Sequence, residues 1–144
     1  MKNAVIDANL LVSLVLPLPY SEQAQELILI RKQEGAVLSS PALWSYEVVS
    51  VLRRAHVQRI LTEETLTSAL GFIWDLGIQS VLPTLDLHIL SLEWADRLQS
   101  SKAYDSAYLA AAELLQVEFW TADQKLAKAA QRQGVNWVHA VGAE

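Results

Sequence analysis

Short apolar runs with β propensity alternate with longer helical segments along the 144 residues of this chain. The patterns predict strands over 3–6, 37–39, 78–82, 117–120 and 137–138. They predict helices over 10–16, 21–34, 41–59, 63–76, 86–99, 103–115 and 124–133. Strands separated by helices pair mainly in parallel and need helices on both faces of the sheet. The sequence therefore predicts an α/β sandwich.

Residues at the expected helix ends set these boundaries. Pro17 and Pro19 follow the first helix, and Pro41 opens the third. Three polar residues are expected to cap later helices at their N-terminal ends: Ser21, Thr62 and Asp86. Three glycines are expected to end helices: Gly35, Gly77 and Gly134.

Length and composition bound the class of protein. The chain is one domain's worth of sequence, so we expect residues 1–144 to form a single domain. There is no cysteine, which excludes a disulfide and fits a cytoplasmic protein. Asp7 and Asn9 interrupt the only candidate signal-peptide core, and the longest apolar run is far too short to cross a membrane. We therefore expect a soluble, cytoplasmic protein.

The net charge of −5 neither excludes nor supports a polyanionic substrate. Basic residues form three sparse clusters: Arg31-Lys32, Arg53-Arg54-Arg59 and Lys125-Lys128-Arg132. Ordinary solvent-exposed helices with no binding role would show the same pattern. However, 4 of the 16 acidic residues can be set aside as candidates for one site, which leaves 12 acidic against 11 basic residues. A nearly neutral remainder is compatible with nucleic acid but does not indicate it.

Four acidic residues follow apolar stretches or lie within them: Asp7, Glu47, Asp105 and Asp123. Asp7 and Asp123 come just after predicted strands, and sites in parallel α/β sheets form at the carboxyl ends of strands. Each acid also has a purely structural interpretation. Asp7 and Asp123 can cap helices, Asp105 suits the first turn of a helix, and Glu47 can pair with an arginine or face solvent.

Taken together, the four carboxylates indicate a metal site. Two like charges about 5 Å apart at an effective dielectric near 20 repel by roughly 3 kcal/mol. Six such pairs, even discounted for distance, approach the ~5–15 kcal/mol stability of a whole domain. A cluster of this kind must hold protons or bind a cation. Oxygen ligands without cysteine or a nearby histidine favour Mg²⁺ or Mn²⁺ over zinc.

Other chemistry has little support in the sequence. The three histidines share no metal-ligand spacing: His56, His88 and His139. No Gly-x-Ser-x-Gly motif and no glycine-rich phosphate loop is present. The five tryptophans are most simply core and interface residues.

Four ordered motifs resemble those of the PIN-domain ribonucleases, in particular the small toxins of bacterial VapBC toxin–antitoxin pairs. They are Val-Ile-Asp7-Ala-Asn9-Leu-Leu-Val, Glu47-Val-Val-Ser-Val-Leu, Tyr104-Asp105-Ser-Ala-Tyr-Leu-Ala-Ala-Ala and Thr121-Ala-Asp123-Gln-Lys-Leu-Ala. Each motif is short, but the ordered set spans essentially the whole chain. The departures are small: Asn9 stands where Ser or Thr is also usual, and Ser106 follows Asp105 where Ala is commoner.

The resemblance implies a three-layer α/β/α sandwich with a central mainly parallel sheet, a Mg²⁺- or Mn²⁺-dependent endoribonuclease, a homodimer and a cognate antitoxin. Asp7 and Asp105 would chiefly hold the metal, and Glu47 and Asp123 would complete the acidic site. Thr121 and Asn9 would orient carboxylates. Contacts to RNA or antitoxin are expected from three basic residues: Arg53, Arg54 and Lys102.

Two other functions stay open from the sequence. The fold could serve as a catalytically silent dimerisation or binding module, although such a module has no reason to keep a repulsive acidic cluster. A housekeeping RNA-processing nuclease would use the same chemistry as a toxin. A phospho-acceptor receiver domain is disfavoured, because it needs a nucleophilic Asp after a middle strand beside an early acidic pair.

Overall fold

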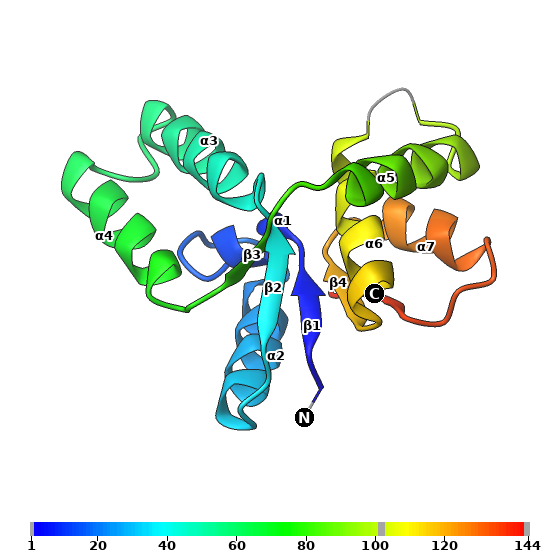
Figure 1. Cartoon of the computed structure of the whole chain (residues 1–144). Helices are drawn as coiled ribbons and strands as arrows, with labels where there is room; N and C mark the ends of the chain where they lie inside the picture. Colours follow the sequence, from blue (N-terminus) through cyan, green and yellow to red (C-terminus); the bar gives the residue numbers. More distant parts are fainter. Residues whose placement is uncertain (1, 101–102, 143–144) are drawn as a thin grey trace.

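The computed structural model describes residues 2–100 and 103–142 and has a parallel sheet at its centre (Figure 1). Its strands are β1 (Ala4–Ile6), β2 (Leu38–Pro41), β3 (Gln79–Val81), β4 (Glu118–Thr121) and β5 (Val138–Ala140). The sheet order is β3-β2-β1-β4-β5, and every neighbouring pair is parallel. The predicted α/β class and parallel sheet are therefore confirmed.

Helices connect each strand to the next one along the chain, and they follow the predicted order. They are α1 (Ala8–Val12), α2 (Ser21–Gln33), α3 (Trp44–Val57), α4 (Glu63–Trp74), α5 (Leu85–Arg97), α6 (Tyr104–Leu115) and α7 (Gln124–Gln131). No helix in the described part of the chain is both long and apolar enough to cross a membrane.

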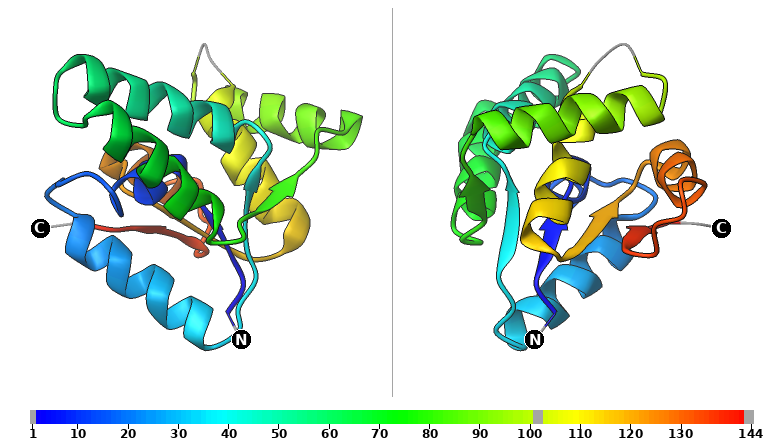
Figure 2. Two further views of the ribbon diagram at one scale, coloured as in Figure 1. Left: turned by 90° about the vertical axis from the view of Figure 1, so that its left-hand side faces the viewer. Right: turned by 45° about the vertical axis from the view of Figure 1, so that its right-hand side comes forward.

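The sheet is covered on both faces, as Figure 2 shows for α2 and α6. Successive side chains of a strand point to opposite faces. On β4, the ring of Phe119 packs against Tyr108 of α6 at a centroid distance of 5.8 Å. The next residue, Trp120, faces Arg31 of α2, whose guanidinium lies 5.7 Å from the ring centroid. The chain therefore forms three layers, helix on sheet on helix.

Burial explains why the central strand reads as an unbroken apolar run. All three residues of β1 are at most 1% exposed, because the strand has neighbours on both edges and helices on both faces. By contrast, the edge strand β3 has two exposed residues and one partly buried residue, and its sequence is correspondingly polar.

Two predicted N-caps and one predicted helix start are wrong, and the local structure explains each one. Ser21 does not cap α2, because its hydroxyl donates to the Leu16 carbonyl and accepts from the Leu18 N–H. Thr84, not Asp86, caps α5 by accepting the Leu87 N–H at 3.0 Å. Pro41 is the last residue of β2 rather than the start of α3.

Other predicted ends are correct. Thr62 caps α4 in a capping box with Thr65. Gly35, Gly77 and Gly134 all take the positive φ that ends a helix. The first helix begins earlier than predicted because Asp7 caps it.

The layout leaves the carboxyl ends of the strands flanked by helices on two sides. The α3–α4 hairpin extends to the left in Figure 1, and α5 with α6 lies to the right. The turns that follow β1 and β4 lie between these two groups of helices. Because β1 and β4 are adjacent and parallel, these two turns lie at the same edge of the sheet.

Candidate active site

The four acidic residues singled out in the sequence all lie at the N-terminal ends of helices. Asp7 and Asp123 are the N-cap residues of α1 and α7, and Glu47 and Asp105 lie in the first turns of α3 and α6. The positive end of a helix dipole favours a carboxylate. The structural interpretation is thus correct for Asp7, Asp105 and Asp123. It is wrong for Glu47, which accepts from Tyr108 instead of pairing with an arginine or facing solvent. It does not account for the gathering of the four acids at one place.

Asp7 is the buried member of the set, at 8% exposure. One carboxylate oxygen accepts the Thr121 hydroxyl at 2.8 Å, and the other accepts the Asn9 N–H at 3.3 Å. Burial raises the pKa of Asp7 from 3.8 to about 7, even though both hydrogen bonds act to lower the pKa. The charges of Glu47 and Asp105 also raise the pKa. All three acids therefore lie within electrostatic reach of one another.

Thr121 and Asn9 join the turn after β1 to the turn after β4. Asn9 donates from its side-chain amide to the Thr121 hydroxyl oxygen at 3.3 Å and accepts the Ala122 N–H at 3.1 Å. The same Thr121 oxygen accepts the Asp123 N–H at 3.0 Å. Thr121 is completely buried, so its hydroxyl has a fixed set of partners. These contacts hold Asp7 in one orientation and fix the backbone of Asp123 beside it.

Glu47 is half-buried and has a partner that the sequence did not suggest. Tyr108 donates its hydroxyl to a Glu47 carboxylate oxygen at 2.5 Å. Burial raises the pKa of Glu47, this hydrogen bond lowers it, and the charge of Asp105 raises it again. Tyr108 is fully buried and lies one helical turn after Asp105. A tyrosine at that spacing, in a helix otherwise rich in Ala and Leu, was the signal that could have identified it.

Asp105 and Asp123 form the solvent-facing part of the set, since both residues are exposed. Partial burial of its carboxyl group raises the pKa of Asp105, and the charge of Asp123 raises it further. Asp123 accepts the Leu126 N–H at 3.0 Å as it caps α7. The charge of Asp123 thus acts on Asp105, and the charge of Asp105 acts on Asp7 and Glu47.

The chemistry of these donors fits a divalent cation that prefers oxygen ligands. In residues 2–100 and 103–142, no group of three or more Asp, Glu, His or Cys side chains is close enough to hold an ion by itself. Mg²⁺ usually keeps several waters and takes one or two protein carboxylates. The predicted assignment of Asp7 and Asp105 as the chief ligands would match that preference.

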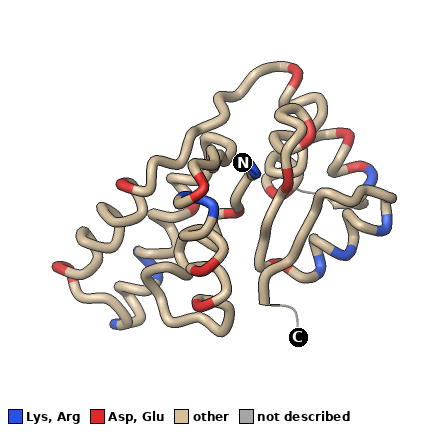
Figure 3. Tube along the Cα trace, turned by 90° about the horizontal axis from the view of Figure 1, so that it is seen from below, with Lys and Arg blue, Asp and Glu red and all other residues tan. Residues whose placement is uncertain are grey.

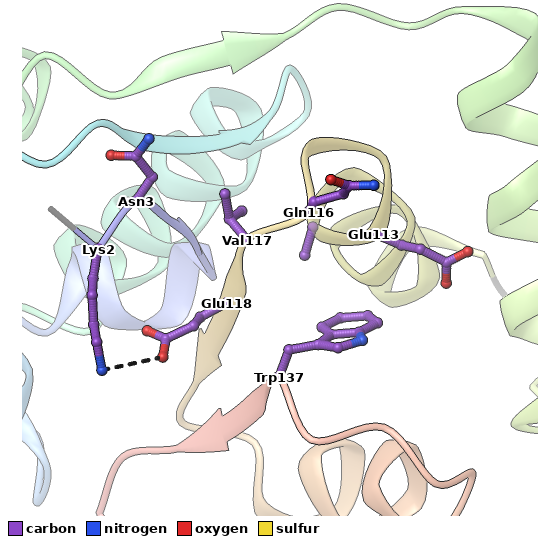
Figure 4. Close-up of a pocket in the computed structure, with 8 residues that line it drawn as sticks. Lys2, Asn3, Glu113, Gln116, Val117, Glu118 and Trp137 are labelled. Carbon is purple, nitrogen blue, oxygen red and sulfur yellow. Dashed lines mark ion pairs between the residues drawn. The ribbon is translucent and has the colours of Figure 1, made fainter.

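A cavity of about 650 Å³ lies at the other end of the sheet, where β1 and β4 begin. Lys2, Glu118 and Trp137 are among its lining residues, and Lys2 pairs with Glu118 at 4.0 Å (Figure 4). None of the four acids of the candidate site lines this cavity. The acidic site and the cavity are therefore separate features of the fold.

The remaining residues predicted to have a role are not brought to the acids by any described contact. Arg53 and Arg54 are exposed on α3, and neither makes a side-chain hydrogen bond or ion pair with the residues that the structure describes. Lys102 lies outside the described residues. Among the histidines, His56 bonds the Leu61 carbonyl and His139 lies 3.6 Å from Glu118.

Comparison with known proteins places the fold. The PIN domain family model matches residues 4–132. A solved toxin–antitoxin complex from Klebsiella pneumoniae is similar, with a TM-score of 0.60, 20% identity, and coverage of 95% of this chain and 96% of that one. The protein PAE2754 from Pyrobaculum aerophilum gives a TM-score of 0.64 at 19% identity, covering 89% and 79%. No curated protein matches significantly.

Proposed function

The chain belongs to the PIN domain family, and from that premise and the geometry of its acidic site we propose that it is a metal-dependent endoribonuclease that hydrolyses RNA phosphodiester bonds. PIN domains are generally nucleases, and they typically use divalent metals. We propose Mg²⁺ or Mn²⁺ as the cofactor, one PIN-like domain over residues 1–144, and action in the cytoplasm.

The observation that carries this proposal is the buried, strongly perturbed carboxyl of Asp7 beside two further acids. Burial raises its pKa to about 7, so charge on Asp7 is unfavourable when no cation is bound. A divalent cation held by Asp7 would offset that penalty. A PIN fold used only as a binding module gains nothing from this arrangement.

We assign the metal chiefly to Asp7 and Asp105, with Glu47 and Asp123 completing the site. A divalent cation bound there would lower the pKa of a coordinated water and offset the negative charge that develops on the phosphate. The protein's own part is positional. Thr121 and the Asn9 N–H hold the two oxygens of Asp7, and Tyr108 fixes one oxygen of Glu47.

We further propose that the protein is the toxin of a type II toxin–antitoxin pair. The solved structure from Klebsiella pneumoniae that it resembles is described as a toxin–antitoxin complex. An apolar groove of about 490 Å³ between α3 and α4 supports a protein partner, since Tyr46, Val49 and Trp74 line it. All three side chains are exposed, with Tyr46 at 79%.

A homodimer is proposed through α5. Leu85, Ile89 and Leu92 are 75%, 47% and 64% exposed and are spaced so that they form one stripe along the helix. Leu82, at 69% exposure, lies in the segment before the helix. A self-complementary apolar stripe of this kind suits a twofold contact between two copies.

The test of the nuclease is cleavage of a mixed RNA pool by purified protein with Mn²⁺ or with EDTA. Asp7→Asn is the inactive variant, and Asp86→Asn, which changes an exposed acid on α5, is the matched control. Cleavage that requires Mn²⁺, survives Asp86→Asn and is lost in Asp7→Asn supports the proposal. A Mn²⁺-dependent rise in melting temperature, read in the same samples, reports on the metal site without depending on the RNA target.

The alternative functions give different results in that experiment. A silent binding module shows neither cleavage nor a Mn²⁺ shift. A housekeeping RNA-processing nuclease cuts as the toxin does, but its expression does not arrest growth and needs no antitoxin. Expression of the chain in a bacterial host, with and without the adjacent gene, separates these two roles.

A further inference from the structure

The exposed face of α7 carries only positive charge. Lys125, Lys128 and Arg132 are all exposed, while Leu126, Ala127 and Ala130 of the same helix are buried. From residue 124 to residue 142 the sequence contains no acid. In Figure 3 a run of blue positions lies on the right, on the side of α7, while other blue positions are scattered along the rest of the trace. A chain with a net charge of −5 thus keeps one surface of the opposite sign.

Helical geometry places these three cations in a row. They are separated by three and four residues, so they project from the same side of the helix. At a rise of 1.5 Å per residue, the row extends for about 10 Å. None of the three side chains makes an ion pair or hydrogen bond with any described residue. The helix begins at Asp123, so the row starts about one turn from the acidic site.

A groove of about 320 Å³ runs beside this row and shares Lys128 with it. Its floor includes Trp120 and His139, whose rings lie 4.6 Å apart with 31° between their planes. Gln124 and Gln131 form its wall, and their side-chain amides donate to the backbone carbonyls of Val141 and Val138. No described residue donates a hydrogen bond to their amide oxygens.

The other basic clusters differ from this one. Arg31 is buried and bonded to Glu118 at 2.9 Å, and Lys32 donates to the Leu76 carbonyl. The α3 cluster, comprising Arg53, Arg54 and Arg59, is exposed and has no ion pair with a described residue, and none of the three lines the groove between α3 and α4. Its three arginines therefore make a matched control for the three cations of α7.

We propose that the α7 row and the Trp120–His139 groove bind single-stranded RNA and lead it to the acidic site. This inference rests on the proposed nuclease, because it supplies the path for that enzyme's substrate. Lys125, Lys128 and Arg132 contact consecutive phosphates. One base enters the groove and stacks on the Trp120–His139 pair, while Gln124 and Gln131 accept from its exocyclic amino or ring N–H groups.

Single-stranded RNA fits these features better than an acidic protein does. Cations would suit either partner, but aromatic rings beside them offer a surface on which an unpaired base can stack. Glu118, the acid nearest the groove floor, is already paired with Arg31, so it does not oppose phosphate strongly. The substrate of a nuclease must also reach Asp123, from which this row starts.

Binding of a fluorescent single-stranded RNA in EDTA tests the proposal, since no cleavage is expected without metal. The α7 variant changes Lys125, Lys128 and Arg132 to alanine, and the control changes Arg53, Arg54 and Arg59 to alanine. Each phosphate contact on a single strand contributes about 0.7 to the slope of log affinity against log salt. Loss of three contacts lowers that slope by about 2. The weakening of wild-type binding between 50 and 200 mM salt is then roughly twentyfold greater than that of the α7 variant.

The groove is tested separately with His139. His139→Ala is expected to weaken binding of the RNA, and His139→Phe, which keeps an aromatic ring, is expected to retain it. Melting temperatures of all variants near that of the wild type verify that the fold is intact.

Several results would overturn the proposal. Unchanged affinity and salt slope in the α7 variant exclude the path, and so does an equal loss in the α3 control. Loss of binding to an acidic protein partner alone, with RNA binding intact, makes the row a protein contact. Failure of the wild type to bind the strand at low salt also rejects the path. The cleavage assay judges the nuclease independently, so an enzyme that cuts but passes RNA elsewhere is distinguishable from a chain that does not cut.

Discussion

Replacement of Asp7 by asparagine should make the metal-free protein more stable at alkaline pH. The carboxyl titrates at about 7 in the folded chain and near 3.8 when unfolded. Between these two values the folded state binds more protons than the unfolded state, so the free energy of unfolding falls as pH rises. The free energy of unfolding falls by about 1.36 kcal/mol for each pH unit between the two pKa values. The loss therefore reaches about 4 kcal/mol above pH 7.

The asparagine side chain of the Asp7→Asn variant carries no charge and avoids this loss. It accepts less well than a carboxylate from the Thr121 hydroxyl and the Asn9 N–H. A weakened hydrogen bond costs about 1 kcal/mol. The variant is therefore expected to be about 3 kcal/mol more stable than the wild type at roughly pH 8.5 and about equally stable at roughly pH 4.5. For a chain of this size, 3 kcal/mol corresponds to roughly 6–12 °C in melting temperature.

Calorimetric melting in EDTA from about pH 4.5 to about pH 8.5 measures the effect. The convergence of the two curves toward about pH 4.5 is the diagnostic feature, because a general change in packing would shift the variant equally at every pH. Asp86→Asn, at an exposed position on α5, should run parallel to the wild type. Parallel curves for Asp7→Asn as well would refute the reasoning that burial of this carboxyl opposes its charge.

Other changes test the rest of the site. Asp105→Asn should raise the metal-free melting temperature near neutral pH and abolish the Mn²⁺ shift, and a sharp drop instead would make Asp105 a structural residue only. Tyr108→Phe removes the hydroxyl that donates to Glu47, so the pKa of Glu47 should rise and the acid limb of the activity–pH profile should move to higher pH. Thr121→Val keeps the shape of the side chain but removes the hydroxyl that donates to Asp7. The free energy of unfolding, measured in urea, should therefore fall by about 1–3 kcal/mol. Leu85→Glu should convert a dimer to a monomer in light scattering, and an unchanged mass would exclude α5 as the interface.

The layers of the fold could be predicted from the sequence because apolar runs and helix-ending glycines are strong local patterns. β1 is an apolar run, since it is buried on both faces, and the glycines that end α2 and α4 take positive φ. Errors occurred where a side chain had a choice of partners. Ser21 bonds backward to the preceding loop instead of capping α2, and nothing in the local sequence shows that choice.

For the acidic residues, the sequence could indicate the type of chemistry but not the arrangement. The strand-end positions of Asp7 and Asp123 follow from the parallel sheet. The bond between Tyr108 and Glu47 joins residues 61 positions apart, on α6 and α3, and depends on how these helices pack. The role of the α7 cations likewise needed the structure, because the three basic clusters look alike until burial, pairing and the adjacent Trp120–His139 groove distinguish them.

Whether the acidic site cuts RNA is decided by cleavage with the purified chain in Mn²⁺ and in EDTA, beside Asp7→Asn, with the melting temperature read in the same tubes. The acidic site described here predicts metal-dependent cutting and a Mn²⁺ stabilisation, both absent from the variant. Cutting that persists in EDTA, or in Asp7→Asn, would contradict it. So would a wild-type protein that neither cuts RNA nor responds to Mn²⁺.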